Sequence, residues 1–502
     1  MNRIAVISPL FAIAALAPAF GQSPIAPAYD QPYRPQFHFS PHKNWTNDPN
    51  GLVYFEGEYH LFFQYNPFGD EWGHMSWGHA VSRDLLHWKQ LPVAIPESDG
   101  IMIFTGSTVI DERNTSGFCK GGKVCMVAIY TGHTPESQGH PALQTQNLAY
   151  SNDRGRTWTK YAGNPVLNLH MSDFRDPKVF WSRQNNGWVM AVSLPNDHKI
   201  RFYGSGNLKR WEMLSEFGPA GASGGQWECP ELFELPVEGE LGKSRWVLKV
   251  GLNPGALQGG SGEQYFVGQF DGTRFVNDNP SSTTLWTDYG KDCYCALTFN
   301  HLPAGRTPVM IGWMNNWQYA AKLPTSPWRG QMTFPRSLSL HRTREGLRLF
   351  QEAIGNIEQL ETPTRGILPN THSFRIQSEM HLGTAQEVGW RLLADKSHYT
   401  LVGYDRRNAK LFVDRTHSGL RDFSKDFPVR VEAPLKLNGD LLRLDMLVDR
   451  CSIEVFADGG RVTMTNLVFP PPGANRLESF IKGGESGGGT AKAYRIQSIY
   501  AK

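Results

Sequence analysis

Three stretches of the chain place a carboxylic acid one or two residues before a proline at the start of an apolar run. Asp48 lies in the first of them (residues 45–55), Asp176 in the second (175–180) and Glu228 in the third (228–233). Proline and acidic residues favour turns, and the β-branched and aromatic residues that follow them favour strands. Each acid is therefore expected at the start of a β-strand, and the recurrence predicts a fold built from one repeated unit.

Two further strand starts of this polar-then-apolar kind lie at residues 104–107 and 288–292. The starts are separated by about 50 to 70 residues, which is enough for a four-stranded sheet with loops of variable length. Up to about Ser339, short runs of alternating apolar and polar residues, broken by Gly, Asn, Asp and Pro, indicate strands and turns rather than helices. The sequence predicts an all-β fold whose first domain, residues 36–345, is a five-bladed β-propeller.

Three turns share a serine, an acid or amide two residues later, and a tryptophan at the end: residues 82–88, 151–158 and 205–211. The polar side chains are expected to bond the amides of the turn, and each tryptophan is expected to fill the space between blades. We interpret these turns as structural.

The pattern changes after residue 345. Residues 346–368 are expected to be a linker, and within them 351–360 is the best helix candidate of the chain after its first 21 residues. From 369 to 502 the chain returns to strand alternation with Gly and Asp turns. A C-terminal β-sandwich domain packed against the propeller is expected there.

The first 21 residues resemble a secretory signal, with Arg3 before an uncharged apolar run and small residues before Gln22. The protein is therefore expected to be secreted or periplasmic, where disulfides are stable. Of the 6 cysteines, Cys119 and Cys125 flank a turn that a hairpin disulfide could close. The other four are expected to be small core residues, because none has the spacing of a zinc site.

The formal net charge is +3 on 502 residues, without a basic stripe. This balance gives no reason to expect nucleic acid or a membrane surface as a partner.

The first strand of each propeller blade lines the central channel, so the acids at the starts of these strands are expected to meet at one mouth. Paired carboxylates that flank a sugar are typical of glycoside hydrolysis. We expect Glu228 to be the least solvated, to have a raised pKa and to act as the acid. Asp48 is expected to stay ionised, with help from Asn47, and to act as nucleophile. Asp176 is expected to pair with Arg175 and to grip ring hydroxyls.

Large aromatic side chains lie near the expected strand ends: Trp72, Trp77, Phe104, Trp313 and Trp317. Residues 71–77 and 313–328 are expected to form opposite walls of a dead-end pocket, in which aromatic rings stack on a terminal sugar. An enzyme with such a pocket acts on chain ends.

The chain resembles glycoside hydrolase family 32, the β-fructosidases. The resemblance rests on WTNDPNG (45–51), FTGS (104–107), RDPK (175–178), ECPELF (228–233) and DYGKDCYC (288–295), and on VDRCSIEVFADGG (448–460) for the sandwich. It implies a secreted exo-acting enzyme that removes fructose from levan, inulin or sucrose, with Asp48 as nucleophile, Asp176 as transition-state stabiliser and Glu228 as acid/base. It implies no metal or organic cofactor. The residues it implies for holding the fructosyl unit are Asn47, Gln64, Trp72, Phe104, Ser107 and Arg175. Cys293 and Cys295 depart from the family pattern, which has an aromatic residue and an alanine there.

Four alternatives remain open. The enzyme could be an invertase that acts mainly on sucrose, or an inverting furanosidase of the arabinanase kind, which also uses two Asp and a Glu. Residues 151–158 prompt a sialidase interpretation, which is disfavoured because no tyrosine nucleophile with an Arg cluster is evident. A fructan-binding lectin without catalysis is the alternative outside the enzymes.

Overall fold

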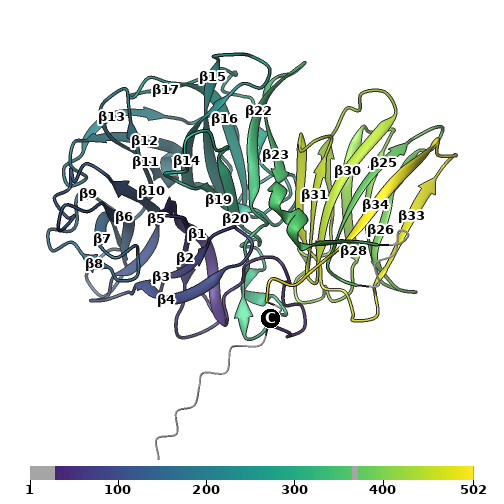
Figure 1. The fold of residues 1–502 in the computed structure, drawn as a ribbon, viewed down its shortest axis with the longest axis horizontal. Coiled ribbons are helices and arrows are strands. Elements are labelled where there is room, and N and C mark those ends of the chain that lie inside the picture. The colour runs from purple at the N-terminus through teal and green to yellow at the C-terminus, as the bar shows by residue number, and fades with distance from the viewer. Residues whose placement is uncertain (1–28, 365–370, 501–502) are drawn as a thin grey trace, which may run out of the picture.

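The computed structural model describes residues 29–364 and 371–500. Its strands form two parts that lie side by side, a propeller and a sandwich (Figure 1). The expected all-β class is confirmed, because the helices of the described residues are short 3-10 segments, Pro195–Asp197, Ala320–Lys322 and Gly355–Leu360. None of the described helices is long and apolar enough to cross a membrane. The expected secretory signal, residues 1–21, lies outside the described residues.

Within residues 29–364, the propeller contains five sheets, and each is an antiparallel meander whose strands pair in chain order. The first sheet holds β1 (Asn44–Phe55), β2 (Glu58–Tyr65), β3 (Ser76–Ser82) and β4 (Lys89–Ile95), with β21 (Trp328–Arg329) parallel to β1. The second holds β5 (Met102–Asp111), β6 (Cys125–Thr134), β7 (Leu143–Ser151) and β8 (Thr159–Lys160), with β9 (Leu167–Met171) beside β7.

The third sheet holds β10 (Arg175–Ser182), β11 (Gly187–Leu194), β12 (Lys199–Ser205) and β13 (Glu212–Phe217). The fourth holds β14 (Gln226–Pro236), β15 (Ser244–Asn253), β16 (Gly262–Phe270) and β17 (Phe275–Asn277), with β18 (Leu285–Trp286) beside β16. The fifth holds β19 (Tyr294–Thr298), β20 (Val309–Trp313), β22 (Arg336–Thr343) and β23 (Gly346–Ala353).

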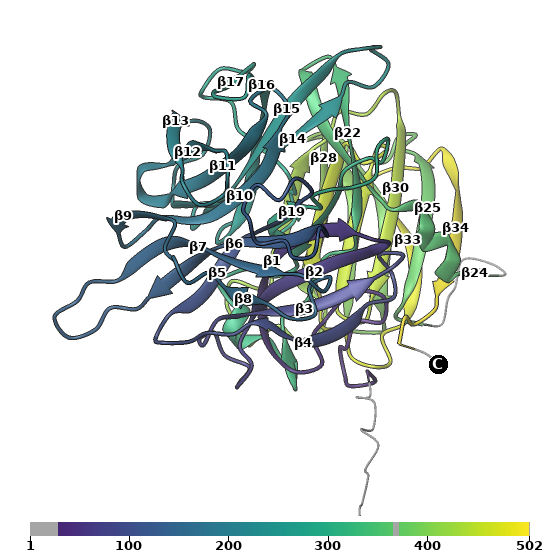
Figure 2. The same cartoon turned by 60° about the vertical axis from the view of Figure 1, so that its left-hand side comes forward.

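The first strands of the five sheets, β1, β5, β10, β14 and β19, contact one another in a closed cycle. Figure 2 shows these strands near the middle of the propeller, with β4, β13 and β17 toward its rim. Residues at the starts of the first strands therefore meet although they lie far apart in the sequence.

The three tryptophan turns have the expected structure. In each of them the indole N–H donates to the carbonyl three residues earlier: Trp88 to Leu85 at 3.1 Å, Trp158 to Gly155 at 3.0 Å and Trp211 to Leu208 at 2.9 Å. The side chains of Asp84, Asp153 and Asn207 accept from amides of their own turns. The expected bonding of the turn amides is confirmed, and these bonds close the turns that join the third and fourth strands of three sheets. That each tryptophan fills the space between blades stays a prediction.

The sandwich consists of two antiparallel sheets. The sheet nearer the propeller holds β24 (Glu361–Pro363), β34 (Gly488–Ile496), β25 (Phe374–His381), β30 (Leu441–Asp449), β31 (Ser452–Ala457) and β32 (Val462–Leu467). The outer sheet holds β29 (Arg430–Pro434), β28 (Lys410–His417), β27 (Tyr399–Asp405), β26 (Glu387–Ala394) and β33 (Arg476–Lys482). Alternate side chains of both sheets point inward and form one apolar core.

Two predictions from the sequence are wrong. Residues 351–360 do not form an α-helix: strand β23 extends to Ala353, and the 3-10 segment Gly355–Leu360 follows. Pairing of β23 with β22 decides this segment, because tertiary context overrides its local preference. Cys229 and Cys295 are not separate core residues, because they form a disulfide. Cys119 and Cys125 form a second disulfide, while Cys293 and Cys451 are buried thiols.

Candidate active site

The register of every first strand breaks at the same level of the channel. The breaks lie between Thr46 and Pro49 in β1, Ile103 and Gly106 in β5, Arg175 and Lys178 in β10, Glu228 and Glu231 in β14, and Tyr294 and Leu297 in β19. A bulge re-aims side chains and is common beside active sites. Here the bulges turn polar groups from five separate sheets toward one point. They fall at the polar motifs that the sequence places at the start of each first strand.

The structure brings Asp48, Asp176 and Glu228 together. The charge of Glu228 raises the pKa of both aspartates, and the charge of Asp48 raises that of Asp176. The backbone N–H of Cys229, the residue after Glu228, donates to Asp176 Oδ2 at 2.9 Å. Three acids that are far apart in the sequence thus share one site, as expected from the propeller.

Asp48 is buried and has one side-chain oxygen satisfied by Thr105, whose Oγ1 donates to Oδ2 at 2.7 Å. Its other oxygen, Oδ1, has no hydrogen-bond partner among the described residues. Burial raises the pKa of Asp48 to about 7, although the bonds from Thr105 and Asn47 oppose the shift. The raised pKa opposes the expectation that Asp48 stays ionised, because the loss of solvent outweighs the hydrogen bonds that favour its charged form.

Glu228 has a different environment from the one expected. Its side chain is 19% exposed, whereas Asp48 and Asp176 are 8% and 5% exposed as whole residues. Arg175 donates to Glu228 Oε1 from Nε at 3.1 Å and from Nη2 at 2.9 Å. The hydroxyl of Tyr294 donates to Glu228 Oε2. The carboxylate of Glu228 is held from both sides, and it is not the least solvated of the three.

The ion-pair partners of Arg175 also differ from those predicted. Its guanidinium crosses to Glu228 on β14 and pairs with Asp173 at 2.8 Å, rather than with its neighbour Asp176. Asp176 has a left-handed backbone, with φ of 67°, and its carboxyl instead accepts from the N–H of Cys229. Burial raises the pKa of Asp176, an effect that the charge of Arg175 only partly offsets.

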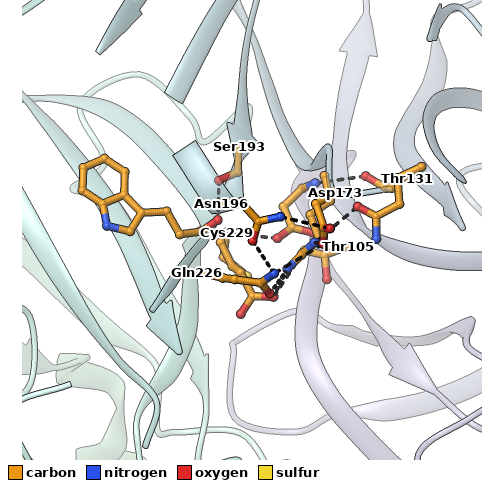
Figure 3. A network of polar contacts seen from close by, with 12 residues as sticks. Thr105, Thr131, Asp173, Ser193, Asn196, Gln226 and Cys229 are labelled. Carbon is orange, nitrogen blue, oxygen red and sulfur yellow. Dashed lines mark hydrogen bonds and ion pairs between the residues drawn. The ribbon is translucent and has the colours of Figure 1, made fainter. Parts of the chain in front are cut away.

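A polar network that sequence reasoning missed holds Arg175 in place (Figure 3). Its Nη1 donates to Asp173, and Nη2 donates to Gln226 Oε1 at 2.7 Å. Gln226 in turn donates to Asn196 at 2.8 Å, and Asn196 donates to Asp173 at 3.2 Å. Thr105 and Tyr294 were missed as well, although both lie inside motifs that the sequence marks, FTGS and DYGKDCYC.

The predicted binding residues differ in how much of their side chains is exposed. Trp72 is 46% exposed, and its ring meets that of Phe104 edge to face at 6.0 Å, so both can contact a ligand at the mouth. Asn47 accepts from the indole of Trp45 at 2.8 Å, and Gln64 donates to the carbonyl of Ile103 at 3.0 Å. Both amide side chains are almost fully buried.

Ser107 and Trp313 do not fit direct contact with a ligand. The hydroxyl of Ser107 donates to the carbonyl of Pro177 at 2.9 Å and accepts from the N–H of Val179 at 2.8 Å, so it joins β5 to β10. Trp313 is 0% exposed and packs under Trp317, 4.8 Å between ring centroids. Trp317 is the partly exposed ring of that segment, and Trp313 supports it from below.

The channel narrows below the acids. A cavity of about 10 Å³ lies there, lined in part by Thr105, Asp176 and Cys229. The floor is closed by the ion pair of Lys178 with Glu231, 2.7 Å apart and almost fully buried. A cavity of this size holds about one water molecule. Little open space therefore remains in this part of the channel.

Two groups of side chains in the described residues have ligand atoms close enough for a metal ion: Asp48 with Cys229 and Cys295, and Asp111 with Cys119 and Cys125. In each group the two sulfurs are bonded to each other. The thiolate is the form of cysteine that ligates metals, so neither group fits a metal while its disulfide is intact.

The comparisons with known proteins agree over nearly the whole chain. Residues 38–353 match the model of the glycosyl hydrolases family 32 N-terminal domain, and 342–499 match that of the family 32 C terminal. The chain is 47% identical to a levanase of Bacillus subtilis (strain 168), over 91% of this chain and 69% of that protein. It is 36% identical to invertase 2 of Saccharomyces cerevisiae (strain ATCC 204508 / S288c), over 88% of this chain and 90% of the relative.

The extracellular exo-inulinase of Aspergillus awamori is 43% identical over 94% of this chain and 96% of its own length. The crystal structure of the exo-inulinase from the same organism superposes with a TM-score of 0.90, at 41% identity, and the match covers 94% of this chain and 100% of that one. The propeller and sandwich described above thus superpose on that structure.

Proposed function

The chain belongs to glycosyl hydrolase family 32, and from that membership we propose that it is a retaining exo-β-fructosidase, which releases terminal fructose from levan, inulin and sucrose. Relatives named levanase, exo-inulinase and invertase support this substrate class. The observation that carries the proposal is the convergence of Asp48, Asp176 and Glu228 at the mouth of a channel that is closed below. Two carboxyl groups acting on one sugar are the machinery of glycoside hydrolysis.

The reaction proceeds in two steps. Glu228 donates a proton to the glycosidic oxygen while the carboxylate of Asp48 attacks the anomeric carbon. The bond between that carbon and the glycosidic oxygen breaks, the rest of the substrate leaves as an alcohol, and a covalent fructosyl-enzyme forms. Glu228 then removes a proton from water, which attacks the same carbon and frees Asp48. Asp176 accepts hydrogen bonds from ring hydroxyls. Arg175 and Tyr294 orient the carboxyl of Glu228 through both steps.

Asp48 must be ionised to attack, and its buried position raises its pKa to about 7 in the free protein. The first step therefore needs the proton of Asp48 to leave before or as the sugar binds. Activity on the acidic side is expected to fall as pH drops through this raised value, above the ordinary pKa of 3.8.

Exo action is part of the proposal. A cavity of only about 10 Å³ and a buried ion pair line the channel, so a chain cannot pass through the propeller, which supports a pocket that takes a chain end. Trp72 and Phe104 at the mouth supply aromatic surface for the sugar.

Digestion of levan and of inulin tests both the reaction and its direction. An exo-acting enzyme releases fructose from the first minutes, with little early loss of polymer size. A ladder of oligofructosides with fructose lagging behind would show an endo-acting cleft. Rates on sucrose, inulin and levan measured side by side separate a fructanase from an enzyme that is mainly an invertase.

Asp48→Ala tests the nucleophile. It is expected to lower kcat by several orders of magnitude while the circular dichroism spectrum and the thermal transition remain those of a folded protein. Near wild-type turnover would contradict the assignment. Anomer analysis of fresh product by NMR distinguishes retention from the inversion that an arabinanase-type furanosidase would give. A lectin would bind fructan and release no fructose.

The domain bounds and the route of export are part of the same proposal. We propose residues 1–21 as a cleaved secretory signal, a propeller domain that begins at residue 36 and a sandwich domain that runs to 502. The linker expected over 346–368 is too long, because β23 (Gly346–Ala353) belongs to the fifth propeller sheet and β24 (Glu361–Pro363) belongs to a sandwich sheet. The name of an extracellular relative supports secretion. Fructan or sucrose is the proposed partner, without nucleic acid or membrane.

A further inference from the structure

The disulfide between Cys229 and Cys295 lies inside the site rather than beside it. Cys229 falls in the bulge of β14 and Cys295 in the bulge of β19, and these are the first strands of neighbouring sheets. Both residues have left-handed backbones, with φ of 48° and 46°. Such conformations are costly for residues other than glycine and persist only where the surroundings enforce them. A covalent link between the two bulges is one such constraint.

The disulfide closes a ring with the acid/base residue. Cys229 directly follows Glu228, and Cys295 directly follows Tyr294, whose hydroxyl donates to Glu228 Oε2. The S–S bond joins the two backbones, and the hydrogen bond joins the two side chains. Separation of the bulges would therefore pull Tyr294 away from Glu228.

Cys229 also contacts the other two acids, Asp176 and Asp48. The backbone N–H of Cys229 donates to Asp176 Oδ2 at 2.9 Å, and its sulfur lies 3.7 Å from Asp48 Oδ2. A disulfide sulfur carries no hydrogen, so it excludes water from Asp48 without donating a bond to it. Both cysteines are almost fully buried, at 2% and 0% exposure.

We propose that Cys229 and Cys295 are positioning residues for the fructosyl-transfer reaction: their disulfide holds the acid/base pair of Glu228 and Tyr294 in register with Asp48 and Asp176. The inference rests on the proposed function. It assigns a catalytic consequence to Cys295, which stands where the family pattern has an alanine.

A disulfide that only stabilises the fold would behave differently. The chain supplies a matched control, because Cys119 and Cys125 form the other disulfide, on the hairpin that leads from β5 to β6. Removal of either disulfide is expected to lower the thermal transition temperature. Only removal of the one at the site is expected to change turnover and its pH dependence.

The first measurement establishes the disulfides in solution. The full chain, denatured without reductant, is expected to show two thiols, those of Cys293 and Cys451. Proteolytic mapping without reduction is expected to recover the Cys229 peptide linked to the Cys295 peptide. Four thiols, or separate peptides, would overturn the proposal.

The second measurement compares two double variants on sucrose. Cys229→Ala with Cys295→Ala is expected to lower kcat about 10- to 100-fold, the effect of a small misplacement of a catalytic group, with KM changed by less than about twofold. The acidic limb of its kcat/KM profile is expected to shift, because the surroundings of Asp48 change. Cys119→Ala with Cys125→Ala is expected to keep the wild-type kcat and profile. Equal kinetics for the two variants would overturn the inference.

Reduction tests the link without a substitution at the site. In the Cys119→Ala, Cys125→Ala protein, dithiothreitol transfers two electrons and two protons to the remaining disulfide, and becomes a cyclic disulfide itself. Turnover is expected to fall as two new thiols appear, and to return on reoxidation. Full turnover with four thiols titrated would contradict the inference. A wild-type protein that releases no fructose would instead contradict the proposed function.

Discussion

Asp48 depends on a neighbour from another sheet for its ionisation. The hydroxyl of Thr105 on β5 donates to its carboxylate at 2.7 Å. A hydrogen bond to the charged form lowers the pKa of a carboxyl, so this bond opposes the burial that raises the pKa to about 7. We expect Thr105→Val to move the acidic limb of kcat/KM to higher pH by about one pH unit, measured on sucrose from about pH 4 to about pH 8.

Thr108 provides the control for that substitution. It lies three residues further along β5, is buried, and its hydroxyl has no hydrogen-bond partner among the described residues. Thr108→Val is expected to keep the wild-type pH profile. An acidic limb that stays in place in the Thr105 variant, or moves as far in the Thr108 variant, would rule out this role of the hydroxyl.

Tyr294 is a neutral hydrogen-bond donor to the carboxyl of Glu228. Burial and the charge of Glu228 raise the pKa of Tyr294 well above 10.0, so its hydroxyl keeps its proton and acts as a donor. A hydrogen bond to a charged group contributes about 1.5–3 kcal/mol. We expect Tyr294→Phe to lower kcat about 10-fold or more on sucrose, with little change in KM.

Tyr319 makes the same bond elsewhere, from a buried tyrosine hydroxyl to the carboxylate of Asp292. Tyr319→Phe is therefore expected to lower stability and to keep kcat. If both variants lost turnover to the same extent, the loss in Tyr294→Phe would reflect general destabilisation.

At the scale of elements, β2 and β3 carry a buried histidine pair that takes no part in the proposed reaction. His60 Nδ1 lies 3.1 Å from His79 Nε2, and the ring of Phe62 stacks on His79. Burial lowers the pKa of His60 to about 4 and that of His79 well below 6.5. The imidazolium forms of both rings are disfavoured for that reason, so the pair is neutral in the native state.

Acid is therefore expected to destabilise the sheet that holds this pair. Above the unfolded pKa of 6.5, the rings are neutral in both states; as pH falls from 6.5 toward 4, the unfolded state binds protons that the native state does not. We expect His60 alone to lower the free energy of unfolding by up to about 3 kcal/mol over that window. Thermal unfolding between about pH 7 and about pH 4 measures it.

His60→Gln is the test variant, and His140→Gln, at an exposed position, is its control. Relative to its own value at neutral pH, His60→Gln is expected to lose less stability on acidification than the wild type, and His140→Gln is expected to follow the wild type. The same acid sensitivity in all three proteins would show that the pair does not set it.

At the scale of the whole molecule, buried ion pairs join the propeller to the sandwich. His38 lies 2.8 Å from both Asp449 and Glu454 of the sandwich, and Glu454 also pairs with Arg336 of β22 at 2.6 Å. Removal of one partner of a buried pair leaves an uncompensated charge and typically costs about 3–5 kcal/mol. The two parts are therefore expected to unfold together.

His38 makes this interface sensitive to alkali. Burial alone would lower the pKa of His38, but Asp449 and Glu454 raise it to about 9. A raised pKa contributes stability that is fully present below 6.5 and is lost as pH rises through about 9. We expect a loss of about 3 kcal/mol across that window, measured by thermal unfolding.

His38→Gln is expected to be less stable at neutral pH and to lack the alkaline loss. His381→Gln, an exposed histidine of the sandwich that pairs with Asp440, is expected to retain it. An alkaline loss of the same size in His38→Gln would assign the effect to other groups.

The sequence by itself determined the all-β class, because turn residues and period-two alternation are local signals that lie within a few residues of one another. The recurrence of acid-bearing strand starts then predicted the repeated unit, and with it the meeting of Asp48, Asp176 and Glu228. The tryptophan turns belong to the same class, since their bonds span three residues.

Only the tertiary structure decided which groups face each acid. Arg175 pairs with Glu228, 53 positions away, and Cys229 bonds to Cys295, 66 positions away. Ser107 and Trp313 were both predicted to contact the sugar. Instead, Ser107 joins two sheets, and Trp313 packs against Trp317. Closure of the ring brings the first strands together and the bulges set the direction of each side chain, and neither has a local signal in the sequence.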